Sequence, residues 1–147
     1  MIEGDQESFC NDYRYEGDKE QAMNTGYSQI KGLKASVRGF FGGYYNVEVN
    51  LTTLQVSWSF WQGGEQESFG KTIRPATAKK FLEGLKKVNL LNWRAEYVEP
   101  GVLDGTQWSV EIIRDGQNKK MRGNNQYPDE WADFCKLISR IAGKEFS

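Results

Sequence analysis

Residues 54–60 read Leu-Gln-Val-Ser-Trp-Ser-Phe, and this stretch decides the fold. Apolar and polar side chains alternate through all of it, which is the period of a β-strand with one buried face. Val47 and Val49 alternate in the same way with Glu48 and Asn50, so a second strand precedes the first. The chain is therefore expected to be built on a sheet with one apolar and one polar face.

Turn signals divide this region into an antiparallel meander of three strands. Residues 50–53, Asn-Leu-Thr-Thr, separate the first two strands. Residues 62–65, Gln-Gly-Gly-Glu, form a stronger turn because glycine adopts positive φ without steric cost. The third strand is expected over about residues 68–74, and Pro75 ends it.

A helix is predicted after the meander, because apolar residues recur there at steps of three and four positions: Ala78, Phe81, Leu82, Leu85 and Val88. A hairpin follows, with a strand over residues 106–114, a two-residue turn at Asp115-Gly116 and a return strand over 117–122. The return strand is polar and charged, so we expect it at the edge of the sheet.

A second helix closes the chain. Pro128 suits its first position and Gly143 suits its end. Its apolar stripe consists of Trp131, Phe134, Cys135, Ile138 and Ile141. Together these elements predict a single α+β domain of order β-β-β-α-β-β-α. Its antiparallel sheet, a three-strand meander plus a hairpin, has two helices packed on one face.

A set of spaced residues between positions 91 and 134 forms a pattern. It consists of Leu91-Asn92-Trp93, Asp104-Gly105 with Trp108, and Gly123-x-Asn125-x-Tyr127-Pro128-x-x-Trp131-x-x-Phe134. This pattern resembles one found in small, uncharacterised bacterial proteins. The resemblance implies a bacterial or phage origin and supports the order of strands and helices. It attaches no activity and transfers no functional residue.

Composition excludes several kinds of chemistry. The chain has no histidine, so neither a Ser-His or Cys-His nucleophile nor a histidine metal site can form. We predict no metal, no cofactor and no catalytic residue. Of the two cysteines, Cys135 falls on the apolar side of the last helix, which favours a buried thiol over a disulfide with Cys10.

The N-terminal segment, residues 1–27, is acidic, with seven Asp and Glu against Arg14 and Lys19. We expect it to be loosely ordered and solvated, the alternative being an arm that contacts a basic partner. It contains no secretory signal, and no apolar run in the chain is long enough to span a membrane. A soluble, cytoplasmic protein is therefore expected.

The leading hypothesis for function is a non-catalytic module that binds another protein, in the manner of an inhibitor or a toxin-immunity protein. Strict alternation places Trp61 on the polar face with Gln55, Ser57 and Ser59. An exposed Trp61, with Phe69 and nearby tyrosines, would make an interaction patch. The alternative is that the acidic N-terminal segment folds over Trp61.

The second hypothesis is a single-stranded nucleic-acid or small-ligand binder. Residues 31–45 carry three cations, no acidic residue and four aromatics, and Arg38, Phe40 and Tyr44 are its candidate contacts. Aromatic side chains beside a positive groove hold single strands by stacking. The competing interpretation is a glycine-rich turn whose aromatics pack inward.

The third hypothesis is a glycan hydrolase. It would use a carboxylate pair, either Glu96 with Glu99 or Asp104 with Glu111. Three tryptophans, Trp58, Trp61 and Trp108, would then stack on sugar rings. Both Asp-Gly dipeptides are also ordinary turn sequences, which favours a structural role for them.

Overall fold

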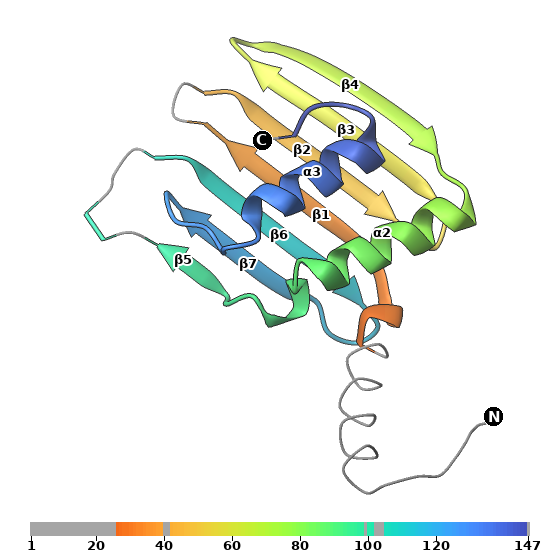
Figure 1. Cartoon of the computed structure of the whole chain (residues 1–147). Coiled ribbons are helices and arrows are strands. Elements are labelled where there is room, and N and C mark those ends of the chain that lie inside the picture. Colours follow the sequence, from red (N-terminus) through yellow and green to blue (C-terminus); the bar gives the residue numbers. More distant parts are fainter. Residues whose placement is uncertain (1–25, 40–41, 99, 102–104, 147) are drawn as a thin grey trace, which may run out of the picture.

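The computed structural model describes residues 26–39, 42–98, 100–101 and 105–146. Its centre is a seven-stranded mixed sheet in the spatial order β4-β3-β2-β1-β6-β7-β5. Helices α2 (Pro75–Lys87) and α3 (Trp131–Ala142) lie together across one face of this sheet (Figure 1). The strands are β1 (Ile30–Arg38), β2 (Tyr44–Asn50), β3 (Gln55–Gln62), β4 (Glu65–Thr72), β5 (Glu96–Val98), β6 (Gln107–Arg114) and β7 (Lys119–Asn124).

The α+β class and the two helices on one face are confirmed, but the meander has four strands before α2 rather than three. The strand missing from the prediction is β1, which lies between β2 and β6 at the middle of the sheet. A register irregularity between Ile30 and Gly32 disturbs only the start of this strand. From Leu33 to Arg38 buried and more exposed side chains alternate, so the period of a strand is present, but the cations and aromatics of residues 31–45 were interpreted as a binding stretch or a glycine-rich turn.

The prediction that the return strand of the hairpin forms an edge is wrong. β7 pairs with β6 on one side and with the short strand β5 on the other, and the β5 pairing is parallel. The connection between these two parallel strands contains β6, whereas α2 and the 3₁₀ turn Leu90–Asn92 carry the chain from β4 at one edge of the sheet to β5 at the other. The two edges of the sheet are therefore β4 and β5.

The turns partly match expectation. Gly63 and Gly64 both have positive φ, as a tight turn between β3 and β4 requires. The Asp115-Gly116 hairpin exists, but its loop runs from 115 to 118, because the Asn118 side chain accepts a hydrogen bond from the Arg114 amide. Leu54 lies in a turn with φ 60° rather than at the start of β3.

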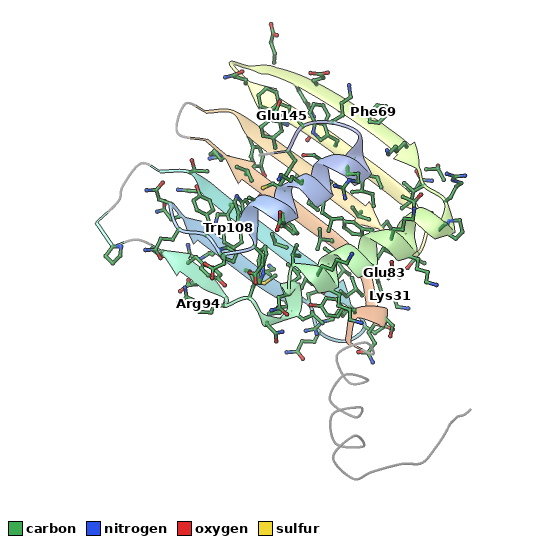
Figure 2. All side chains as sticks on the ribbon, viewed as in Figure 1. Lys31, Phe69, Glu83, Arg94, Trp108 and Glu145 are labelled. Carbon is green, nitrogen blue, oxygen red and sulfur yellow. The ribbon has the colours of Figure 1, made fainter. Side chains whose placement is uncertain are left out.

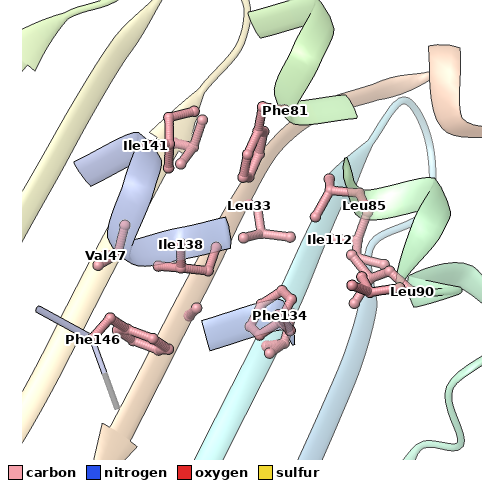
Figure 3. Packing of buried hydrophobic residues seen from close by; sticks show 14 of the residues in the cluster. Leu33, Val47, Phe81, Leu85, Leu90, Ile112, Phe134, Ile138, Ile141 and Phe146 are labelled. Atoms are coloured by element: carbon pink, nitrogen blue, oxygen red, sulfur yellow. The ribbon is translucent and has the colours of Figure 1, made fainter. Parts of the chain in front are cut away.

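The main core lies between the helices and the sheet (Figure 3). The sheet contributes buried side chains to this core, among them Leu33 of β1, Val47 of β2 and Ile112 of β6. The helices bury their predicted stripes against them, with Phe81 and Leu85 from α2 and Phe134 and Ile138 from α3. Burial of large apolar side chains is the dominant force that holds the helices on the sheet.

A cluster of aromatic rings secures the β5–β7 side of the core. The Trp108 ring lies 5.9 Å from Trp93 and 4.7 Å from Trp131, measured between centroids.

The expectation that α3 begins at Pro128 is wrong. Pro128 lies in the preceding turn, where its carbonyl accepts a hydrogen bond from Trp131 N, and the helix begins at Trp131.

The chain after α3 covers the rest of the helix-side face. Gly143 ends the helix with φ 73°, as its position predicts. The next residues cross toward β2 and β3, where the Glu145 carbonyl accepts a 2.7 Å hydrogen bond from Trp58 Nε1. Phe146 is buried, and its amide donates to Ser139 Oγ at 3.0 Å.

Candidate binding face

The second face of the sheet, named the open face here, carries no described helix, since both α2 and α3 lie on the opposite side (Figure 1). Alternate residues of every strand project from it, and the strand register sets them in rows that cross the sheet. Three adjacent rows hold its polar, charged and aromatic side chains.

The aromatic row holds Arg38, Tyr44 and Trp61, on β1, β2 and β3. Arg38 is directly opposite Tyr44, and Tyr44 is directly opposite Trp61. The Arg38 guanidinium carbon lies 5.0 Å from the centre of the Tyr44 ring, within the range of a cation–π contact. Trp61 is 44% exposed. The structure thus brings residues of two separately predicted sites into one row.

The serine row lies beside the aromatic row. It consists of Arg122, Ser109, Ser36, Asn46, Ser59 and Ser68, paired in that order across the sheet. The Ser36 and Ser109 hydroxyl oxygens are 2.6 Å apart, so one donates a hydrogen bond to the other. Small side chains between longer ones leave the surface hollow, and depressions of about 650 and 430 Å³ lie along this row.

The charged row follows, with signs that alternate from strand to strand. Lys120 is opposite Glu111, Glu111 is opposite Lys34, and Lys34 is opposite Glu48. Opposite charges directly across strands stabilise a sheet by about 0.2–1 kcal/mol per pair. Beyond this row's end, Arg122 Nη2 forms a 2.6 Å ion pair with Glu96 of β5.

The open face is close to neutral overall. Its cations are Lys34, Arg38, Lys120 and Arg122, and its anions are Glu48, Glu96 and Glu111. The two signs are interspersed rather than collected into a stripe. Such a surface matches a partner that itself carries both signs.

The four residues Gln55, Ser57, Ser59 and Trp61 do lie on one face, as alternation predicts. Phe69, expected beside Trp61, does not join them. It is directly opposite Trp58, whose ring lies on the helix side, so Phe69 projects from that side too. Phe40, the remaining predicted contact, lies outside the described residues, as do residues 1–25 of the acidic segment 1–27 that was expected to be able to cover Trp61. Tyr27 of that segment is described, and its side chain is buried.

The arrangement proposed for a glycan hydrolase is not assembled by the described residues. Trp58 and Trp108 are buried on the helix side, whereas Trp61 is on the open face, so the three cannot form one stacking platform. Glu99 and Asp104 lie outside the described residues. Of their intended partners, Glu96 pairs with Arg122, and Glu111 Oε2 accepts a hydrogen bond from Asn118 at 3.2 Å.

The remaining ionisable and thiol groups provide no reactive centre among the described residues. Within the described ranges, no three Asp, Glu, Cys or His side chains lie close enough to hold a metal ion. Cys135 is a free, buried cysteine, as expected, and burial raises the pKa of its thiol to about 12. A thiol held in its protonated form is a poor nucleophile. None of the described helices is long and apolar enough to cross a membrane.

Sequence reasoning missed about half of the open face. Ser36, Asn46, Ser109, Lys120 and Arg122 were not singled out, although each occupies the polar phase of its strand. Period-two alternation within each strand was the available signal. The pairing of strands that are distant in sequence determines which of these polar side chains become neighbours on the face.

The sequence matches no protein-family model and no curated protein.

Proposed function

We propose that this chain is a non-catalytic module whose open face binds another protein, as inhibitors and toxin-immunity proteins do. The observation that carries the proposal is the exposure of Trp61 in register with Tyr44 and Arg38. Trp, Tyr and Arg are the residue types that contribute most to the free energy of protein–protein binding. All three stand on paired strands, so little backbone freedom must be lost on binding.

The serine row gives such a partner a place to fit. Its depressions adjoin the aromatic row along the sheet, and hydroxyl and amide groups line them. A protruding loop or helix of a partner could insert there and exchange hydrogen bonds with Ser36, Asn46 and Ser59. Arrangements of this kind combine an aromatic anchor with adaptable polar contacts.

The charges favour a protein over a nucleic acid. A groove that follows a phosphate backbone concentrates cations of one sign. On the open face the anions Glu48 and Glu111 alternate with Lys34 and Lys120 instead. These carboxylates would repel phosphate, whereas they would pair with cations of a partner protein.

The experiment compares two exposed aromatic side chains on different sides of the molecule. Trp61→Ala removes the anchor of the open face. Tyr127→Ala is the matched control, because Tyr127 is 38% exposed but packs against Trp131 on the helix side. Both variants and the wild-type chain serve as baits in an extract of the source organism, and each retained protein is then purified and titrated against all three.

The proposal expects Trp61→Ala to weaken binding of the purified partner by about thirtyfold or more, the effect of a hot-spot residue. Tyr127→Ala should leave the affinity unchanged. Equal affinities for all three baits would contradict the proposal. So would tight binding of a fluorescent single-stranded oligonucleotide that falls steeply with salt, since that is the behaviour of phosphate contacts.

A further inference from the structure

Strand β4 forms one edge of the sheet, and no described strand or helix lies beyond it (Figure 1). It is eight residues long, and residues 65–70 are all exposed. A free edge presents unpaired backbone N–H and C=O groups that can join another strand. The opposite edge, β5, has only three residues, and short edge strands are one way in which proteins avoid such pairing.

The side chains of β4 are complementary to a second copy of the same strand. Glu67, Phe69 and Lys71 project on the helix side of the sheet, opposite Phe60, Trp58 and Val56 of β3. Phe69 is 41% exposed at the centre of the three (Figure 2). When two β4 strands run antiparallel with Phe69 opposite its own copy, each Glu67 faces a Lys71. Both ion pairs and the aromatic pair then form at once.

The other side of β4 accepts the same register. Ser68 would face Gly70, and Gln66 would face Thr72, so only small or neutral side chains meet on the open face. Proline, which cannot donate a backbone hydrogen bond, is absent from β4 and first occurs at Pro75. In this register neither face of the strand places a proline or a like charge against the second copy.

Neighbouring registers fit less well. A shift of two residues in one direction places Glu67 opposite Phe69 and Glu65 opposite Lys71, which keeps two ion pairs but loses the aromatic pair. A shift in the other direction places Phe69 opposite Lys71 and loses both kinds of contact. A shift of four residues puts either Glu67 or Lys71 opposite its own copy, which is repulsive. Only the alignment with Phe69 opposite its own copy combines the aromatic pair with two ion pairs.

We propose that two copies of this chain associate through antiparallel β4 strands, with Phe69 opposite Phe69 and Glu67 opposite Lys71. The two sheets would then continue into one another. Directly opposed residues share a face, so both helix layers lie on one side and both open faces on the other. This inference does not depend on the proposed function.

The test measures the mass of the full chain in solution by sedimentation equilibrium. The wild type should approach twice its 16.9 kDa with rising concentration. Glu67→Lys and Lys71→Glu each place like charges opposite one another twice, so each should weaken the dimer by about tenfold or more. The double variant Glu67→Lys/Lys71→Glu restores opposite charges and should restore the dimer.

Two controls fix the interpretation. Glu65→Lys makes the same charge change on the same strand without facing a like charge, so its dimer should be nearly unaffected. Lys144→Gln removes the only ion pair described for Glu67, 4.0 Å between Lys144 Nζ and Glu67 Oε2, and should also leave the dimer intact. A stronger effect of Glu65→Lys than of Glu67→Lys would contradict the alignment.

A disulfide locates the alignment directly. In a Cys10→Ser background, Phe69→Cys should form a disulfide-linked dimer under mild oxidation, because cysteines opposed across antiparallel strands have suitable Cα distances. Glu65→Cys should not. A wild-type chain that stays monomeric at the highest attainable concentration would overturn the proposal, as would a double charge variant that fails to restore association.

Discussion

The two faces of the sheet use tryptophan in opposite ways. On the helix side, the Nε1 atoms of Trp58, Trp93 and Trp108 each donate to a backbone carbonyl, at 2.7, 2.9 and 2.8 Å, and all three rings are buried. On the open face, Trp61 is nearly half exposed, and its indole makes no hydrogen bond that is described for residues 26–146 outside the gaps. The first three tryptophans hold the fold together, and the fourth is available to a partner.

The same contrast holds for charge. No charged side chain is buried on the helix side among the described residues. Every charged residue of the open face is instead placed opposite another polar group by the strand register. The helix side holds the buried apolar contacts of the fold, and the open face presents polar and charged side chains whose signs alternate within the chain.

The largest effect should come from the helix side. Trp108→Ala removes a ring that contacts Trp93, Tyr97 and Trp131, and it leaves the Gln126 carbonyl without its donor. We expect the free energy of unfolding to fall by about 3–5 kcal/mol. Urea denaturation followed by far-UV circular dichroism measures this. A loss below about 1 kcal/mol would show that the aromatic cluster is not part of the core.

A smaller effect is expected where a glycine allows Trp108 to pack. A Cβ added at Gly123 would lie 2.0 Å from Trp108 Nε1 and 2.7 Å from the Gln126 carbonyl oxygen. Gly123→Ala should therefore cost about 1–3 kcal/mol through overpacking. Gly70→Ala is the control, since its nearest neighbour is an ordinary 3.7 Å away. If the two variants were equally stable, the close packing of Trp108 against Gly123 would not contribute to stability.

The smallest effect should come from the open face. Trp61→Ala deletes an exposed side chain, so the free energy of unfolding should change by less than about 0.5 kcal/mol. Urea denaturation beside Trp108→Ala gives the comparison under one set of conditions. If Trp61→Ala destabilised the chain as much as Trp108→Ala, Trp61 would belong to a core and the two faces would not differ.

Local patterns predicted the parts of the fold that they encode. The alternation of residues 54–60 gave the two faces of β3, and the apolar stripes gave both helices. The strand β1 alternates regularly from Leu33 to Arg38, but it was missed because the cations and aromatics of residues 31–45 were interpreted as a binding stretch or a glycine-rich turn. The three residues of β5 are too few to show any period.

The candidate site was predicted in fragments for a related reason. Trp61 and Ser59 were grouped correctly because they share one strand. Arg38 and Tyr44 were assigned to a separate nucleic-acid site, because nothing local reveals that β2 aligns Tyr44 with Trp61. Register between strands depends on the packing of the whole sheet, and it is this register that unites the two fragments.

Hydrogen exchange of the indole N–H groups, followed by NMR on the wild-type chain, tests directly whether the open face is accessible. The account predicts strong protection for Trp58, Trp93 and Trp108, whose indoles are hydrogen-bonded and buried, and exchange close to that of a free indole for Trp61. Protection of Trp61 equal to that of Trp108 would mean that this face is covered, which would contradict its proposed role as a binding surface.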